Sequence, residues 1–192
     1  GLAASIFYNR VDDYILRDRA RGQDGILQAD GATIYRNVEA QLFGGELEVN
    51  MNWSDHWSSR AVVSYVQAEN MDDDLPIAQT PPLWGTLSLD YTASRWTAGG
   101  LLRWSTTQYR VDDDPMTGSG LDARSTPGWA VLDLYADVEV GKQGKVGLGI
   151  NNLFDTTYAY HVNRANVDPF NPDPVQVNEP GRQFYLRASL DF

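Results

Sequence analysis

Apolar and polar residues alternate with a period of two along several segments of this 192-residue sequence. Such alternation predicts β-strands that have one apolar and one polar face. The segment 183–192 is the clearest case. One of its faces would carry Phe184, Leu186, Ala188, Leu190 and Phe192, and the other would carry Gln183, Tyr185, Arg187, Ser189 and Asp191. Apolar and charged side chains therefore separate completely in this segment.

The same alternation predicts an all-β chain. We expect about eight strands, at residues 2–16, 32–53, 57–70, 84–93, 96–109, 129–140, 145–153 and 182–192. No stretch approaches the ~20 consecutive apolar residues that a membrane helix needs. Ten charged residues of these strands are expected on the polar face. They are Glu46, Glu48, Arg60, Asp90, Arg103, Asp133, Asp137, Glu139, Arg187 and Asp191.

The connections between these segments alternate between short and long. Residues 54–56, 93–95 and 141–144 would form tight turns, whereas 17–31, 71–83, 110–128 and 154–181 are long, polar and rich in Gly, Pro, Asp and Asn. Bacterial outer-membrane barrels show this asymmetry, with short periplasmic turns and long extracellular loops. A soluble sandwich has no reason to sort its connections by end. The pattern therefore favours an antiparallel transmembrane β-barrel whose polar face lines the lumen.

All six tryptophans lie in or beside predicted strands, at Trp53, Trp57, Trp84, Trp96, Trp104 and Trp129. Rings near strand ends are typical of the aromatic girdle at a membrane interface. The alternative is ordinary core packing in a soluble β-protein. We favour the girdle because Trp53 and Trp57 flank one tight turn and Trp96 follows another.

Composition narrows the class of protein. The net charge of -11 disfavours nucleic acid as a partner, since binding to nucleic acid needs a basic surface. The absence of cysteine excludes disulfides and thiolate metal sites. Neither G-x-S-x-G nor H-E-x-x-H occurs, so we expect no enzyme. Residues 1–10 have no signal-peptide pattern, so we expect an exported chain to be mature or a piece of a longer protein.

His161 is the candidate for a ligand contact, with Asn163 and Arg164 beside it in the connection 154–181. An exposed imidazole can bind copper or another transition metal. The alternative is a histidine that packs within its loop, since no second histidine or cysteine stands nearby in the sequence. His56 lies in a tight turn at the opposite end and is expected to be solvated.

Acidic runs at 72–74 and 112–114, together with Met71 and Met116, lie in the long connections. Clustered carboxylates can hold Ca²⁺, and methionine sulfur can bind soft metals. The runs lack the ligand spacing and central glycine of a calcium loop, and the methionines lack partner ligands at close spacing. Solvation is the favoured interpretation of the acidic runs. We therefore expect no dedicated metal site and no cofactor.

Three segments resemble motifs of one family. Residues 150–158 (INNLFDTTY) resemble the N-L-F-D-x-x-Y element on the penultimate strand of TonB-dependent receptors. Residues 179–186 (EPGRQFYL) resemble the P-G-R-x-F/Y start of the last strand, and residues 4–15 resemble the mid-barrel F-Y-N-x-I-D-D-Y-I strand. The ending at Phe192, after alternating apolar residues, is similar to the signature that the barrel assembly machinery recognises. These elements follow the family's order over nearly the whole chain.

Within this family, residues 160–166, 168–172 and 177–182 resemble the copper-receptor branch. The resemblance implies a 22-stranded barrel around a plug. Residues 1–192 would then be the C-terminal portion of that barrel, without the plug and the earlier strands. The implied function is uptake across the bacterial outer membrane of a scarce ligand, such as copper, another metal or a metal chelate. The implied partners are outer-membrane lipid, the TonB complex acting on a TonB box and the plug, and the assembly machinery at Phe192.

The alternative function is a self-contained eight-stranded outer-membrane barrel with a structural or adhesive role. Eight strands are enough to close a small barrel whose interior is filled by side chains. In that barrel the strand 2–16 would pair with the strand 182–192. In a large receptor each of these two strands would have a different neighbour.

Overall fold

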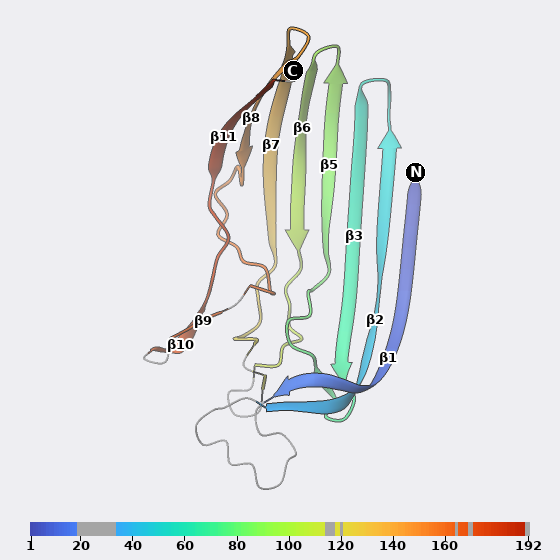
Figure 1. Cartoon of the computed structure of the whole chain (residues 1–192), viewed down its shortest axis with the longest axis vertical. Helices are drawn as coiled ribbons and strands as arrows, with labels where there is room; N and C mark the ends of the chain where they lie inside the picture. The colour runs from blue at the N-terminus through green and yellow to red at the C-terminus, as the bar shows by residue number, and fades with distance from the viewer. Residues whose placement is uncertain (19–33, 114–117, 120, 164, 169–170, 191–192) are drawn as a thin grey trace.

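A computed structural model describes residues 1–18, 34–113, 118–119, 121–163, 165–168 and 171–190 (Figure 1). The strands are β1 (Leu2–Asp18), β2 (Ile34–Asn52), β3 (Trp57–Asn70), β4 (Leu75–Pro76), β5 (Trp84–Ala93), β6 (Trp96–Ser105), β7 (Trp129–Val140), β8 (Gly144–Asn151), β9 (Ala165–Asp168), β10 (Asn171–Gln176) and β11 (Gln183–Leu190). Among the described residues, no helix is long and apolar enough to cross a membrane.

The long strands form one antiparallel sheet in the order β1-β2-β3-β5-β6-β7-β8-β11, and the short β4 pairs with the end of β3. The sheet curves into an arc with β1 and β11 at opposite edges (Figure 1). Within the described residues β1 pairs only with β2, and β11 pairs only with β8. The described sheet is therefore open, and β1 and β11 do not close it into an eight-stranded barrel.

The predicted all-β antiparallel fold is confirmed, with three differences. The two-residue strand β4 lies within the predicted connection 71–83. The strand predicted at 96–109 ends at Ser105, because Gln108 forms an isolated bridge with Thr126 instead of continuing the ladder to β5. The connection 154–181 contains the hairpin β9–β10, which was not predicted. Its second strand holds Pro172 and Pro174, and proline is a signal against a strand because it cannot donate to the ladder.

Strand register places the two predicted faces as expected. One row across the sheet pairs Leu89, Gly100, Leu134, Ile150 and Phe184, which all belong to the apolar face. The adjacent row pairs Asp90, Gly99, Tyr135, Gly149 and Tyr185, which belong to the polar face. The charged residues predicted to share one face do so. Asp191, the last of them, lies outside the described residues.

Aromatic pairs bound the apolar face at both ends. The rings of Trp57 and Tyr91 lie 5.0 Å apart next to the short turns, and those of Phe43 and Tyr65 lie 6.4 Å apart toward the long connections. Trp57 and Tyr65 are separated by eight residues of β3, which corresponds to about 26 Å. This span matches the apolar band of ~25 Å that barrel proteins present to lipid.

The girdle prediction is correct for some tryptophans and wrong for others. Trp53, Trp57 and Trp96 are exposed on the apolar face beside the short turns. Trp84 and Trp129 instead share the polar face with Ser105, to which both are paired in the ladder. Sequence position near a strand end did not reveal which face each ring would occupy.

The short turns lie at one end of the sheet, and the described parts of the long connections lie at the other, as predicted (Figure 1). At the latter end β1 and β2 bend sharply. The bend coincides with a register shift between Val11 and Tyr14 and with the positive φ of 59° at Asp13. A bulge of this kind bends a strand and increases its twist.

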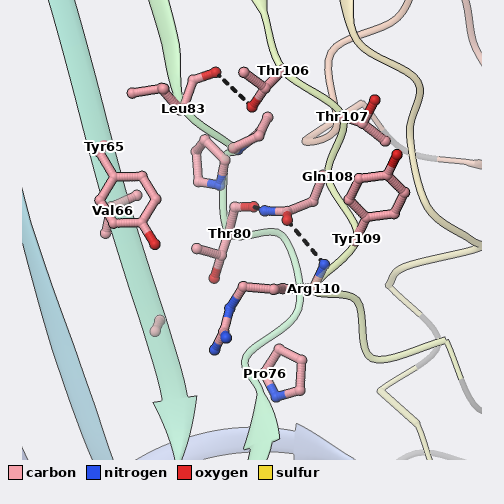
Figure 2. A pocket seen from close by; sticks show the side chains of 13 residues that line it. Tyr65, Val66, Pro76, Thr80, Leu83, Thr106, Thr107, Gln108, Tyr109 and Arg110 are labelled. Atoms are coloured by element: carbon pink, nitrogen blue, oxygen red, sulfur yellow. Dashed lines mark hydrogen bonds between the residues drawn. The ribbon is translucent and has the colours of Figure 1, made fainter.

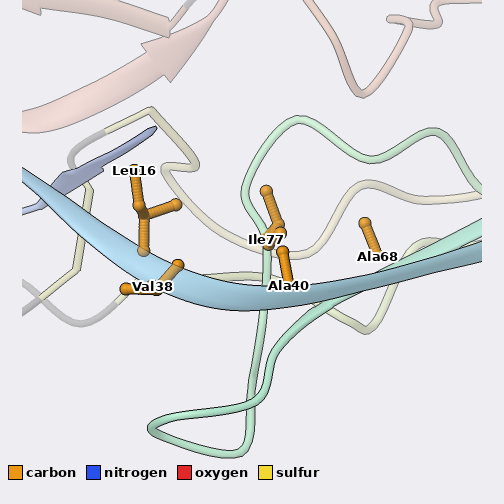
Figure 3. Close-up of a cluster of buried hydrophobic side chains, with 5 residues drawn as sticks. All are labelled: Leu16, Val38, Ala40, Ala68 and Ile77. Carbon is orange, nitrogen blue, oxygen red and sulfur yellow. The ribbon is translucent and has the colours of Figure 1, made fainter. Parts of the chain in front are cut away.

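The bent ends of β1 and β2 cover a small apolar core. It consists of Leu16, Val38, Ala40, Ala68 and Ile77, all buried (Figure 3). Val38, Ala40 and Ala68 belong to β2 and β3, and Ile77 follows β4. This core fixes the connection after β3 against the inner side of the bend.

The two motifs near the C-terminus, residues 150–158 and 179–186, contact each other. After β8, the buried Asn152 adopts a φ of 53°, and its amide donates to Thr156 O and accepts from Thr156 N, both at 2.8 Å. Asp155 accepts a hydrogen bond at 2.7 Å from the backbone N–H of Arg182, the residue before β11. A Cβ at Gly181 would come within 2.7 Å of the same Asp155 oxygen, so glycine is needed for this approach.

Candidate functional site

A network of polar side chains lies on the polar face at the loop end of β6 and β7. The guanidinium of Arg103 binds both carboxylate oxygens of Asp133, at 3.1 and 3.3 Å. It also lies 3.4 Å from the hydroxyl of Tyr158 and 3.3 Å from that of Tyr160. Asp133 further accepts the backbone N–H of Asn152 at 2.8 Å. The charge of Arg103 is therefore compensated within the wall.

Aromatic rings pack beside this network. The ring of Trp129 lies 4.5 Å from that of Tyr158 and 5.0 Å from that of Tyr160. Burial raises the pKa of Tyr158, although the nearby Arg103 acts in the opposite direction. Its hydroxyl is therefore protonated at neutral pH, when it can donate and accept hydrogen bonds.

A cavity of about 320 Å³ opens beside the rings of Trp129 and Tyr160. We call it the mouth pocket, because it lies where β5 and β6 meet the connection after β8. Its lining includes Pro82, Trp84, Arg103, Trp129 and Tyr160. Apolar walls with a few fixed polar groups are typical of sites for small organic molecules, and the volume falls at the lower end of the ~300–1,000 Å³ that such sites occupy.

A second, smaller cavity of about 180 Å³ lies between β3 and the segments 80–83 and 106–110 (Figure 2). Gln108 closes one side by donating to Thr80 O at 2.6 Å, and its own oxygen accepts from the Arg110 N–H at 3.0 Å. Tyr65 lies on the opposite wall. These contacts hold two connections against β3. We therefore attribute this cavity to the packing of the connections.

His161 is buried, with 6% of its surface exposed, which agrees with the interpretation of a histidine that packs among loop residues. Its Nδ1 lies 2.9 Å from Thr126 Oγ1, and its Nε2 lies 3.4 Å from Asp122 Oδ1. Asp122 also accepts the backbone N–H groups of Gln79 and Asp112, at 2.9 and 3.1 Å. His161 therefore ties together three long connections, which was the alternative reading of the sequence.

The pKa of Asp122 reflects this position. Burial acts to raise it, but hydrogen bonds from His161 and from the backbone of Gln79 and Asp112 lower it overall. The cavity beside the pair measures only about 10 Å³, room for at most one water molecule. Although His161 stands between a hydroxyl and a carboxylate, this burial leaves no room for a substrate at Thr126.

The other two ligand candidates lie beside His161 in sequence. Asn163 donates to Val177 O at 3.1 Å and to Glu179 Oε1 at 2.7 Å, so its amide holds the loop closed. Arg164 lies outside the described residues. A direct ligand contact by any of these three residues stays a prediction. His56 is exposed as expected, with its Nδ1 2.9 Å from Thr92 O.

The acidic runs have structural partners. Asp73 pairs with Arg36 and accepts from Asn70 at 2.7 Å, and Asp112 accepts the backbone N–H of Ser119 at 2.8 Å. Asp114 and Met116 lie outside the described residues, and Met71 is exposed. In the part of the chain that the structure describes, no three His, Cys, Asp or Glu side chains are placed to hold a metal ion.

Polar pairs continue along the same face toward the short turns. Arg60 binds Glu48 through two contacts at 3.0 and 3.1 Å, and Arg187 binds Asp137 at 2.7 and 2.8 Å. Gly147 lies between the last two residues in the ladder, and a Cβ there would overlap Asp137 and Arg187. Sequence reasoning placed the charges on one face but missed this role of glycine.

Sequence reasoning also missed the mouth pocket. Arg103 and Asp133 were assigned to the polar face, but their link to Tyr158 and Tyr160 depends on how the connection after β8 folds. The only signal in the sequence was the period-two register, which places Trp129 on the face opposite to Ala130 and Leu132. That signal predicts a face and cannot predict a loop contact.

Comparisons with known proteins agree with the strand pattern. Residues 1–153 match the model of the TonB-dependent receptor-like β-barrel family. Among solved structures, the copper transporter OprC is similar over 100% of this chain and 29% of its own length, with 31% identity and a TM-score of 0.87. The ferric yersiniabactin uptake receptor FyuA from Yersinia pestis matches at 18% identity and a TM-score of 0.72, over 100% of this chain and 27% of that protein.

The ferripyoverdine receptor of the outer membrane of Pseudomonas aeruginosa matches at 17% identity and a TM-score of 0.68, over 100% of this chain and 25% of that receptor. Likeness at this identity, as for FyuA, shows the fold alone. The chain spans between a quarter and a third of the length of these proteins. The family model covers most of the chain, and the open antiparallel sheet matches part of such a barrel. The chain belongs to the TonB-dependent receptor-like β-barrel family.

Proposed function

We propose that this chain is the C-terminal part of the barrel wall of a TonB-dependent receptor that takes up a scarce ligand across the outer membrane. The observation that carries the proposal is the two-faced open sheet with the mouth pocket at its loop end. Its apolar face would contact outer-membrane lipid, and its polar face would line the lumen. The role is transport and not catalysis.

This proposed placement implies contacts with a plug, with the TonB complex and with the assembly machinery. A plug inside the complete barrel would contact the polar face and would carry the TonB box through which the TonB complex acts. Phe192, two residues after β11 in sequence and outside the described residues, would be the contact for the assembly machinery. The open edges at β1 and β11 support this reading over the self-contained eight-stranded barrel, since lipid does not tolerate unpaired strand edges.

Copper, another metal or a metal chelate is the proposed ligand. Copper is favoured by the 31% identity to OprC, which is named as a copper transporter. The mouth pocket favours a chelate over a bare ion. Its guanidinium is already bound by Asp133, and its walls are the rings of Trp84, Trp129 and Tyr160. Ring faces pack well against flat organic groups and supply no strong ligand for a hydrated cation.

The test uses the complete receptor in a strain that lacks its own copy. Cells supplied with copper, with a copper chelate or with a ferric chelate are compared by measuring cell-associated metal. Receptor-dependent accumulation of copper in any form is the expected result. Accumulation of iron alone would replace copper as the ligand, and no receptor-dependent accumulation of any metal would refute the proposed uptake.

The mouth pocket is tested by the variant Trp129→Ala, which removes one wall. The matched control is Trp96→Ala, the same change on the apolar face. Uptake should fall for Trp129→Ala at low ligand concentration and recover as the concentration rises. Equal uptake by both variants would exclude the mouth pocket from the ligand path while leaving the receptor function intact.

The alternative barrel is tested by cysteines at Ile6 and Leu186, on the two edge strands. Crosslinking within one chain would support a self-closed barrel and defeat the receptor proposal. We expect no such crosslink in the complete receptor.

A further inference from the structure

Among the described residues that line the mouth pocket, Arg103 is the one that carries a permanent charge. The rest of this lining includes prolines, tryptophans, Tyr160 and the buried His161. A free guanidinium in such a place would capture an anion, because its fork of N–H donors matches carboxylate and phosphate oxygens. The charge that a ligand meets in the pocket therefore depends on what Arg103 already binds.

Every nitrogen of the Arg103 guanidinium has a partner within the wall. Nε donates to Asp133 Oδ2 at 3.1 Å and Nη2 to Asp133 Oδ1 at 3.3 Å, while Nη1 lies 3.3 Å from the Tyr160 hydroxyl and 3.4 Å from that of Tyr158. The pair is shielded, with 25% of the Arg103 side chain and 13% of the Asp133 side chain exposed. Asp133 is also fixed by the backbone N–H of Asn152 at 2.8 Å. An anionic ligand would have to displace this carboxylate, which is costly because a shielded charge would then lose its partner.

The aromatic groups of the pocket favour the opposite charge. The ring of Tyr160 lies at 90° to that of Trp129, with the ring centroids 5.0 Å apart, and Trp84 lines the pocket with them. Ring faces carry partial negative charge and attract cations. The Tyr160 hydroxyl accepts from Arg103, so its own proton is available for an acceptor atom of a ligand. Neutral and cationic organic groups therefore match the pocket better than anions do.

The neighbouring connections add negative charge. Residues 71–83, which supply Pro81 and Pro82 to the lining, contain three aspartates and neither lysine nor arginine. Asp122 lies 3.4 Å from His161, and the pKa of its carboxyl is lowered, so it is charged at neutral pH. In a chain with a net charge of -11, the chain's own electrostatic field repels anions that approach the pocket.

We propose that the mouth pocket selects metal chelates without net negative charge, and that Asp133 determines this specificity by neutralising Arg103. The inference rests on the proposed function, since it takes the mouth pocket as part of the ligand path. Asp133 acts through Arg103, because it occupies the guanidinium that an anionic chelate would need. A flat neutral or cationic chelate packs against the rings and accepts a hydrogen bond from Tyr160.

The test is binding of three copper(II) complexes of different charge to the complete receptor, purified in detergent. At neutral pH the bis-histidine complex is neutral, the bis-phenanthroline complex is cationic and the EDTA complex is anionic. Equilibrium dialysis with measurement of copper gives a Kd for each complex. The wild type should bind the EDTA complex at least about tenfold more weakly than the other two, since like charges brought together in an interface are costly.

Charge-changing variants of the pair should alter this preference. Asp133→Asn removes one negative charge and keeps an oxygen that can accept the Asn152 N–H. It should raise the affinity for the EDTA complex and lower that for the phenanthroline complex, and Arg103→Gln should do the reverse. The double variant Arg103→Gln/Asp133→Asn is neutral as a pair and should return to the preference of the wild type. Damage to the pocket would weaken binding of all three complexes together, so the ratio of affinities separates charge from structure.

The matched control is Asp137→Asn, the same change on the same face of β7. Asp137 pairs with Arg187 and is not among the described residues that line the mouth pocket. The control should therefore keep the order of affinities of the wild type. If Asp133→Asn does not fold, Arg103→Gln still decides the matter, because it must shift the ratio toward the cationic complex.

Equal affinity of the wild type for the anionic and neutral complexes would overturn the proposal. So would an unchanged ratio of affinities in the folded single variants, or no binding of any of the three complexes. Receptor-dependent metal uptake by cells without preference for charge refutes only the charge selection. Charge-selective binding by a receptor that drives no uptake of any metal refutes only the proposed function.

Discussion

Asn152 offers the sharpest test of how the connection after β8 is held. Its side chain is 2% exposed and satisfies both backbone groups of Thr156, while its own backbone has a φ of 53°. Two changes separate these contributions. Asn152→Gly removes the amide but keeps a residue that tolerates positive φ, whereas Asn152→Ala removes the amide and also introduces backbone strain.

The magnitudes follow from the contacts. Each lost hydrogen bond leaves a shielded backbone group of Thr156 without its partner, which costs about 1–3 kcal/mol for the less accessible group and about 1 kcal/mol for the other. Asn152→Gly should therefore destabilise the segment by about 2–4 kcal/mol. Asn152→Ala should cost a further ~1–2 kcal/mol, since an L-residue is strained in the left-handed region.

The assay is hydrogen exchange of residues 152–163 in the complete receptor in detergent micelles. Exchange rates of this segment report its local opening free energy, which need not equal that of the whole barrel. The expected order of protection is wild type, then Asn152→Gly, then Asn152→Ala. If the glycine and alanine variants exchange equally fast, strain at Asn152 is not part of the mechanism, and unchanged exchange in both would refute the hydrogen-bond account.

Three further outcomes are expected. The lowered pKa of Asp122 lies below its unfolded value of ~3.9, so its carboxylate contributes stability that is present above that pH and lost as pH falls through the folded pKa. Acid proteolysis of the long connections should therefore accelerate in this range for the wild type and lose that dependence in Asp122→Asn. Gly147→Ala should separate Arg187 from Asp137 and lower the thermal stability of the barrel, unlike the control Gly100→Ala. In membranes, a cysteine at Arg187 should react with a water-soluble reagent while one at Leu186 is protected, and the reverse pattern would refute the assigned faces.

The strands could be predicted because their signal is local and repeated. In β11, every second residue from Phe184 to Leu190 is apolar, and one slip in register would place Arg187 among them. The motifs after β8 and before β11 could also be recognised in the sequence, but the contacts that they make could not be predicted. That Asp155 receives the Arg182 N–H, and that Gly181 permits it, depends on a contact across 27 residues of chain.

The contacts of His161 could not be predicted from its neighbours in the sequence. The sequence left open an exposed, ligand-binding histidine and one that packs within its loop, and its contacts come from Asp122 and Thr126 in a different connection. Burial of a polar side chain in a loop requires partners that sequence spacing does not reveal. The alternative of loop packing was the physically safer interpretation, because a lone histidine has no companion ligands to hold a metal.

Glycines of β8 make room for large side chains on the polar face. On the polar face, Gly147 and Gly149 leave room for Arg187 and Tyr185 to lie flat across β8, so that charges meet their partners within the wall. A residue without a side chain is destabilising within a strand, so its placement needs a gain elsewhere. On the polar face that gain is the ion pair of Arg187 with Asp137.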